Sequence, residues 1–253
     1  MNKSFILLFI TFIMSSISNA ATITWSLGQM NATLGDAVVY NGGIGSGGSV
    51  VWAYDFGSTN TGTTLVNGVT FQKATVSGTT LVRTGLNIGA SGGNLGNGTV
   101  YYDTIPSGVS SSLAALYDDA IYGFATNINT SLNLSLSSLV VGQRYNLQLF
   151  MGDFRAAAGG RTQTVSDGVT TTPAFSQYVS TGFLNFYNGT FVADATTQNV
   201  TINGVGTTAS VPILNAASLQ AIPEPSTYLM VLMLGILFLS FEKIRTRLYC
   251  KLK

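Results

Sequence analysis

The chain of 253 residues is long enough to bury a hydrophobic core, either as one large all-β domain or as two small ones. Charged residues make up only 8% of it, and residues 21–222 carry five Lys and Arg against eight Asp, which gives a net charge of −3. This balance excludes electrostatic binding to a nucleic-acid backbone, and so low a charge content is typical of extracellular β proteins.

The rarest residue types exclude further chemistry. Histidine is absent, which removes the commonest general base and the commonest transition-metal ligand. The single cysteine, Cys250, lies close to the C-terminus, so residues 21–221 contain no disulfide and no thiol chemistry. We therefore predict no catalytic residue, no metal site and no cofactor.

Residues 1–20 have the features of a secretory signal peptide. Lys3 supplies a positive charge, residues 5–14 are apolar apart from Thr11, and Ser18 and Ala20 place small side chains at a cleavage site. An uncleaved anchor helix needs about 18 apolar residues, and this run ends too early. We expect the mature chain to begin near Ala21 and to be exported across the inner membrane.

Residues 21–221 consist of short apolar runs separated by Gly, Asn and Ser, the pattern of an all-β protein. The runs predicted as strands are 22–27, 37–40, 50–56, 69–76, 81–88, 99–102, 132–136, 145–150, 175–179, 182–193, 198–202 and 211–219. Many short strands at this spacing favour a β-sandwich or jelly roll. One domain is expected, because no repeat or long linker interrupts the pattern; a split near residues 92–98 is the alternative.

Alternation of apolar and polar side chains is clearest in two of these runs. Leucines at 132, 134 and 136 alternate with Asn133 and Ser135, and apolar residues at 145, 147 and 149 alternate with Asn146 and Gln148. Residues 137–144 form a plausible tight connection. The two strands are therefore predicted to be antiparallel neighbours.

Two segments depart from the strand pattern. Residues 110–122 place Leu113, Leu116, Tyr117 and Ile121 at helical spacing after serines that can cap a helix, so we predict one short helix at an end of the sandwich. Glycine is too frequent in residues 85–98 for a central strand, which predicts a long mobile loop.

A glycine-rich segment and a charged loop are the candidate ligand sites. Residues 43–48 fit a G-x-G-x-x-G pattern, but a strand is expected to follow them instead of a helix, so we interpret them as a hairpin loop. Asp153, Arg155 and Arg161 follow the strand 145–150 in a loop where a carboxylate and guanidinium groups can hydrogen-bond sugar hydroxyls. The alternative is a solvated ion pair that steadies the loop.

An enzymatic function would depend on aspartates. The exported part has no glutamate before Glu224, so paired carboxylates for glycan cleavage would have to be aspartates, and their spacing singles out no pair. No D-x-[DN]-x-[DN]-G calcium loop occurs either. A secreted aspartate-dependent glycan hydrolase or lyase is therefore the alternative to a non-enzymatic protein, and a self-assembling surface-layer component is a third hypothesis.

Residues 226–241 form a short apolar segment that is followed by Lys243, Arg245 and Arg247. By the positive-inside rule the basic tail stays in the cytoplasm, which predicts a transmembrane helix over about 226–241 with the body outside. The fourteen residues 228–241 rise about 21 Å against a hydrocarbon core of about 30 Å. So short a span suits a processing signal better than a permanent anchor.

Pro223, Glu224 and Pro225 stand directly before this segment. Together with the apolar helix and the basic end they make up residues 222–253, which resemble the PEP-CTERM sorting signal of Gram-negative bacteria that make exopolysaccharide. The resemblance implies that an exosortase, a membrane cysteine transpeptidase, recognises the tail and cuts near the motif. It also implies a cell-surface or extracellular-matrix protein associated with polysaccharide and biofilm.

Within the body, residues 139–155 and 182–200 faintly resemble galactose-binding-like jelly rolls. This resemblance implies a carbohydrate ligand, and it agrees with the expected loop site at Asp153, Arg155 and Arg161.

Overall fold

A computed structural model describes residues 21–30, 36, 39–40, 48–57, 62–76, 78–91, 93–99, 110–124, 130–153, 160–178, 184–206 and 210–223. The predicted signal peptide 1–20, the tail from Glu224 onward and the glycines at 43 and 45 lie outside these ranges. Within them, no helix has the length and apolar character needed to cross a bilayer.

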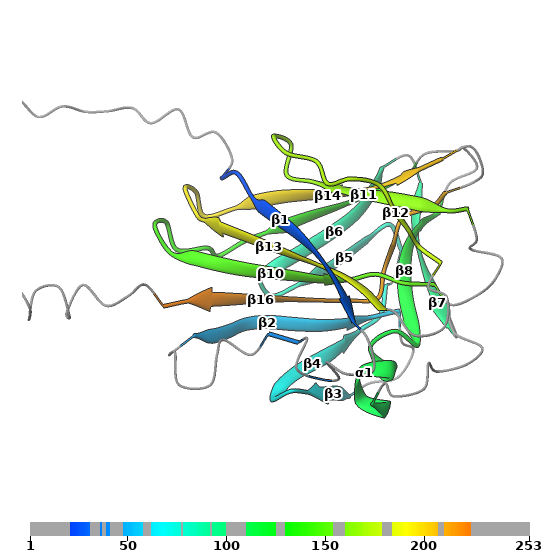
Figure 1. The fold of residues 1–253 in the computed structure, drawn as a ribbon, viewed down its shortest axis with the longest axis horizontal. Helices are drawn as coiled ribbons and strands as arrows, with labels where there is room; N and C mark the ends of the chain where they lie inside the picture. The colour runs from blue at the N-terminus through cyan, green and yellow to red at the C-terminus, as the bar shows by residue number, and fades with distance from the viewer. Residues whose placement is uncertain are drawn as a thin grey trace, which may run out of the picture.

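The largest sheet has seven strands and includes both the first and the last strand of the described chain (Figure 1). Its order is β1 (Thr24–Met30), β13 (Leu184–Val192), β10 (Arg144–Phe150), β16 (Ala216–Ile222), β2 (Ser49–Phe56), β4 (Val69–Ala74) and β3 (Thr63–Val66). All neighbours are antiparallel except β2 and β4, which are parallel. β1 is an edge strand, and β16 lies near the middle.

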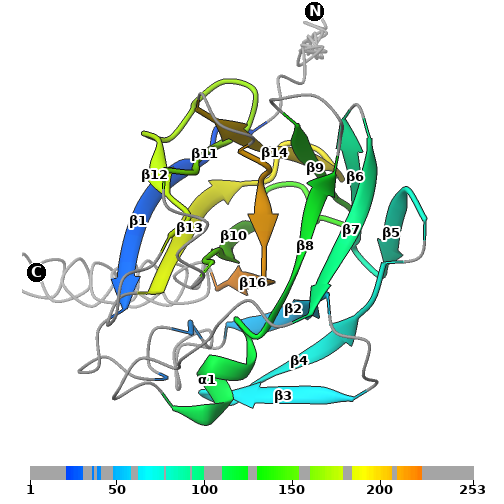
Figure 2. The same cartoon turned by 90° about the vertical axis from the view of Figure 1, so that its right-hand side faces the viewer.

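A second sheet faces the first. Its order is β12 (Phe175–Ser176), β11 (Thr162–Ser166), β14 (Gln198–Val205), β9 (Ser131–Leu136), β6 (Leu86–Ser91) and β5 (Thr80–Arg83). A small sheet of β15 (Ile213–Leu214), β8 (Asp119–Phe124) and β7 (Asn94–Thr99) lies at one end of the molecule, on the right in Figure 1 and toward the viewer in Figure 2.

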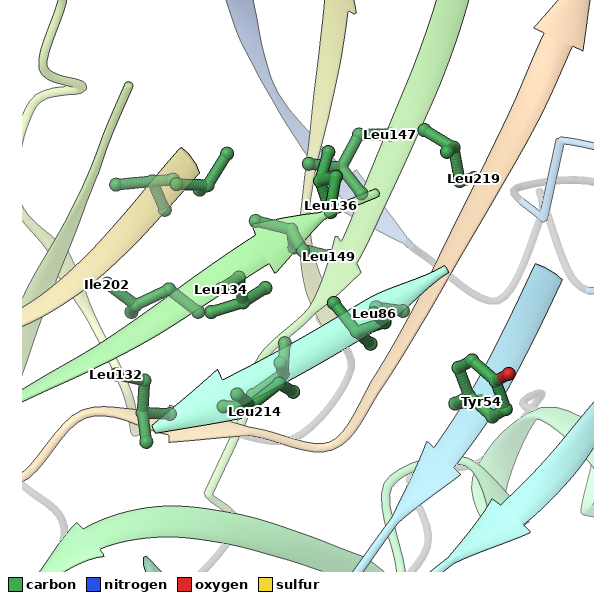
Figure 3. Close-up of a cluster of buried hydrophobic side chains, with 14 of the residues drawn as sticks. Tyr54, Leu86, Leu132, Leu134, Leu136, Leu147, Leu149, Ile202, Leu214 and Leu219 are labelled. Carbon is green, nitrogen blue, oxygen red and sulfur yellow. The ribbon is translucent and has the colours of Figure 1, made fainter. Parts of the chain in front are cut away.

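The core lies between the two large sheets, where alternate side chains of each strand point inward. Leucines from both sheets meet there and are almost fully excluded from solvent, as Figure 3 shows for Leu134 and Leu136 of β9 and Leu147 and Leu149 of β10. The expected all-β fold with one short helix is confirmed, and its arrangement fits a β-sandwich.

The prediction that strands 132–136 and 145–150 are antiparallel neighbours is wrong. β9 pairs with β6 and β14 in the second sheet, whereas β10 pairs with β13 and β16 in the first. Residues 137–143 cross from one sheet to the other, a gap of about 10 Å. Two alternating strands that face each other across the core have the same sequence pattern as two that share a ladder.

The predicted helix over residues 110–122 is correct only in its first half. α1 covers Ser111–Ala115, with Ser110 Oγ accepting a hydrogen bond of 3.0 Å from Leu113 N. From Asp119 the chain is extended in β8, where Ile121 pairs with β7 and β15. Partners for the backbone on both sides of β8 outweigh the helical spacing of its apolar residues.

The prediction of a long mobile loop over residues 85–98 is also wrong. β5 and β6 form a hairpin, which divides the run predicted as a single strand over 81–88, and β7 follows at Asn94. Gly96 has a packing role, because a Cβ atom there would lie 2.4 Å from Cζ of Tyr122 on the neighbouring strand. Glycine in this segment makes room for an aromatic ring.

Several boundaries also differ from the prediction. β3, β8 and β11 have no counterpart among the predicted strands, and Val39 and Tyr40, predicted as the end of a strand over 37–40, are not extended in a sheet. The outer face of the seven-stranded sheet carries a second apolar cluster that includes Phe71, Phe150 and residues of α1. This cluster buries the side of β2 on which Asp55 lies.

Candidate functional site

A groove lies at the open side of the sandwich, beside the edge strands of both large sheets. Its volume is about 510 Å³. One wall comes from β1 and Tyr187 of β13, and the other from the segment that leads into β12. The lining residues are Thr22, Ile23, Thr24, Trp25, Leu27, Thr170, Thr171, Thr172, Pro173, Ala174, Phe175 and Tyr187.

The alternation of β1 brings its apolar side chains into the groove. Ile23 is buried, Trp25 is partly buried and Leu27 is 47% exposed, so the core opens to solvent along this strand. Trp25 lies over Gly189 of β13, where a Cβ atom would come within 2.6 Å of its Cζ3. Glycine at this position allows the indole ring to lie against the sheet.

Three aromatic rings form a connected wall. Trp25 and Tyr187 meet edge to face with ring centroids 6.4 Å apart, and Phe175 and Tyr187 do the same at 5.0 Å. Tyr187 donates its hydroxyl proton to the carbonyl oxygen of Pro173 at 3.3 Å, and burial raises the pKa of this phenol. Trp25 Nε1 is buried and has no acceptor among the described residues.

Asp167 fixes one side of the groove. Its carboxylate accepts hydrogen bonds from the backbone N–H of Ile23, Val169 and Thr170, at 2.5, 2.8 and 2.5 Å. Burial raises its pKa, but these hydrogen bonds outweigh that effect and the net shift is downward. Because its oxygens are occupied, Asp167 positions the backbone of β1 and is not available as a base.

The lining residues carry no carboxylate and no cationic side chain. Hydroxyl groups of Thr22, Thr24 and the run 170–172 are its polar elements, beside the aromatic rings. The groove therefore suits an uncharged ligand that has an apolar face and hydrogen-bonding groups.

The predicted ligand loop is only partly described. Asp153 and Arg161 come together, with Oδ2 of Asp153 3.9 Å from Nη1 of Arg161, whereas Arg155 lies outside the described residues. The Asp153 side chain is fully buried, and its backbone N–H donates to the carbonyl oxygen of Gln177 at 2.8 Å. The ion pair ties the segment after β10 to the start of β11, the backbone hydrogen bond ties it to the residue after β12, and the carboxylate is not presented to solvent.

Among the described residues, Asp55 is the carboxylate whose pKa is raised. Burial raises its pKa to about 6, although a hydrogen bond of 2.9 Å from the Thr64 hydroxyl and the Lys73 ammonium 4.0 Å away favour the ionised form. Its Oδ1 is buried without a hydrogen-bond donor among the described residues. Within the same part of the chain, no three His, Cys, Asp or Glu side chains are placed to hold a metal ion.

Sequence reasoning missed the groove. It predicted strands over 22–27, 175–179 and 182–193, but nothing in their patterns shows that Trp25, Phe175 and Tyr187 meet. A partial signal was present, because Trp25 and Leu27 are large apolar residues two positions apart in one predicted strand, which places both on the same face.

Comparisons with known proteins give no family. No family model and no curated protein matches the chain. Solved structures to which it is similar include a calcium-binding mutant of Bacteroides uniformis β-glucuronidase 2, with 16% identity and a TM-score of 0.46, and B. uniformis β-glucuronidase, with 15% identity and a TM-score of 0.46. Each similarity covers 68% of this chain and 18% of the other.

A third similar structure is the exo-β-1,3-galactanase of Phanerochaete chrysosporium with β-1,3-galactotriose. Its identity is 14% and its TM-score 0.30, over 60% of this chain and 30% of the enzyme. This chain thus spans less than a third of each protein, and likeness at these TM-scores carries no argument about its function.

Proposed function

We propose that this protein is an exported, non-enzymatic surface or matrix protein that binds a neutral polysaccharide in the groove between β1 and residues 170–175. Its body is a jelly-roll form of the sandwich. Residues 222–253 act as a PEP-CTERM sorting signal that anchors the body through a transmembrane helix until an exosortase cuts the tail. The protein then remains at the cell surface or in the extracellular matrix, associated with polysaccharide and biofilm.

The observation that carries the proposed binding is the aromatic, uncharged lining of the groove. The apolar face of a sugar ring can pack on the partly exposed ring of Trp25, while threonine hydroxyls hydrogen-bond the sugar hydroxyls. The volume of about 510 Å³ lies within the range of about 300–1,000 Å³ of small-ligand sites. The absence of charged lining residues favours a neutral glycan over an acidic one.

The groove can be blocked without removing core side chains. Leu27→Arg places a bulky charged group at an exposed lining position, and Leu65→Arg places the same group at an exposed position on β3 as the control. In affinity electrophoresis through gels that contain neutral polysaccharides, we expect Leu27→Arg to weaken retention at least about tenfold, the loss of about 1.4 kcal/mol. Equal retention of both variants would contradict binding in the groove.

The sorting signal has a separate test. Mass spectrometry of the C-terminus, in cells with and without the exosortase, should find chains shortened near Pro223 only when the enzyme is present. A full-length tail in both strains contradicts the sorting proposal and leaves the groove proposal unaffected.

The alternative function is a secreted glycan hydrolase or lyase that uses aspartates, and the raised pKa of Asp55 favours it. Against it, Asp55 is 1% exposed and the groove lining contains no carboxylate. Incubation of the purified protein with a polysaccharide panel should release no new reducing ends. Release that is abolished by Asp55→Asn would replace the binding proposal with the enzymatic one.

A further inference from the structure

The last strand, β16, ends at one end of the seven-stranded sheet, and the described chain leaves the body there. β10 begins there, β13 and β16 end there and β2 begins there, on the left in Figure 1. Arg144 at the start of β10 is opposite Val192 on one side and Ile222 on the other. We call this the exit end, because the chain continues from Ile222 toward the predicted membrane segment.

Exposed valines concentrate at the exit end. Among the described residues nine large apolar side chains are exposed, and five of them lie in strands or turns at this end. We call these five the valine rim: Val50, Val51, Val140, Val141 and Val192.

Hydrogen bonds join the turn that carries Val140 and Val141 to the ends of β13 and β16. The turn before β10 is fixed by Gly142 N donating to Ala193 O at 2.7 Å and by Leu139 N donating to Thr196 O at 3.1 Å. Gln143 Nε2 from the same turn donates to Ile222 O at 2.6 Å. Val140 and Val141 therefore keep a fixed position relative to the last residue of β16.

The chain between the exit and the membrane segment is short. From Ile222 to Ser226, where the predicted span begins, there are four Cα–Cα steps, which reach at most about 14 Å. The two prolines at 223 and 225 stiffen this connection. Whenever the tail lies in a bilayer, the exit end must stay close to the lipid headgroups.

We propose that the valine rim seats the body on the bilayer surface while the tail is in place, with the rim side chains in the interfacial region of the lipid. This inference rests on the membrane topology in the proposed function. Arg144 and Asp194, both exposed near the rim, offset each other in charge, so the seating depends on apolar burial and is insensitive to salt.

The test uses residues 21–253, without the predicted signal peptide, in vesicles of phosphatidylethanolamine and phosphatidylglycerol. In a Cys250→Ser background, Val140→Cys carries a nitroxide at the rim, and Val82→Cys carries it at a matched position on β5, since both valines are 64% exposed. We expect the label at 140 to be several-fold more accessible to oxygen than to a water-soluble nickel complex, relative to the label at 82. This difference should persist at high salt.

The two proposals fail in different ways. A chain that floats with the vesicles while both labels are equally accessible to the nickel complex contradicts the seating alone. A chain that does not float contradicts the membrane topology and the seating together. Matching thermal unfolding of the two labelled variants shows that neither label disturbs the fold.

Discussion

Burial of a single carboxylate makes the stability of this protein depend on pH. The folded pKa of Asp55 is about 6, above the usual value of 3.8, so the folded state holds the proton more tightly than the unfolded state. The stability due to this group is therefore fully present below about pH 4 and is lost as the pH rises through about 6. The difference in pKa corresponds to about 3 kcal/mol.

The variant Asp55→Asn should not lose stability as the pH rises through about 6. The amide oxygen still accepts the hydrogen bond from Thr64, and no charge is buried. We expect the free energy of unfolding in urea to be about 1–3 kcal/mol higher than that of the wild type at about pH 7.5, with little difference at about pH 4. Asp194→Asn, at an exposed site, is the control. A less stable Asp55→Asn at the higher pH would mean that the ion pair with Lys73 dominates.

The pKa of Asp167 is shifted in the opposite direction, so its effect on the pH dependence of stability is also opposite. Its pKa is lowered in the folded state by the backbone hydrogen bonds it accepts, so its stability is present above about pH 4 and is lost as the pH falls through the folded pKa. Asp167→Asn should cost about 2 kcal/mol near neutral pH, because charge-assisted hydrogen bonds to Ile23 and Thr170 are lost. In acid, the free energies of unfolding of the variant and the wild type should become equal. Urea unfolding near neutral pH and in acid measures both differences.

Residue chemistry was only partly predictable from the sequence. The pairing of Asp153 with Arg161 followed from their closeness in one loop. The full burial of Asp153 did not, since it belongs to a segment whose backbone is bonded to Gln177, 24 residues further along the chain. The raised pKa of Asp55 had no sequence signal, because a carboxylate in an alternating strand normally marks the solvent face. Here the second apolar cluster covers that face.

At the scale of elements, the turns of the β3–β4 and β5–β6 hairpins offer a matched pair of glycines, Gly68 and Gly85. Gly85 and Gly68 both have φ of 77°, but a Cβ atom at Gly85 would lie 2.7 Å from Trp52, whereas one at Gly68 would meet nothing within 4 Å. Ala at either position costs about 1 kcal/mol for the backbone conformation. We expect Gly85→Ala to lose about 1–2 kcal/mol more than Gly68→Ala in thermal unfolding. Equal losses would mean that Trp52 moves aside freely.

The success of the element predictions depended on burial. Strands with one face in the core, such as β9 and β10, alternate clearly and were located within a residue or two. The residues of β8 were predicted as the end of a helix, because Ile121 continues the helical spacing of Leu113 and Tyr117. The glycines around β6 and β7 made this segment look like a loop. Gly85 and Gly96 make room for the rings of Trp52 and Tyr122, which lie on other strands.

At the scale of the whole molecule, the strand order makes the C-terminal part of the body essential. β16 lies between β10 and β2 and joins the two halves of the seven-stranded sheet. Residues 21–206 should therefore fail to show cooperative unfolding or protection from proteolysis, whereas residues 21–223 should show both. A cooperative unfolding transition of the shorter chain would show that the sheet closes without its central strand.

The pairing of strands was the part that the sequence could not supply. Alternation shows which side chains face a core, but not whether a facing strand belongs to the same ladder or to the opposite sheet. The groove has the same origin, because it joins residues 22–27 to residues 170–175 across the open edges of both sheets. The patterns therefore predicted the sandwich but not its site.

The late position of β16 along the chain has a consequence for biogenesis. A polypeptide that emerges N-terminus first completes its largest sheet only when Ile222 has appeared, and the apolar segment follows within a few residues. On the proposed topology, completion of the sheet and insertion of the tail into the bilayer are thus nearly simultaneous. On the proposed export route, the body therefore stays an open, protease-sensitive intermediate until its last strand has appeared.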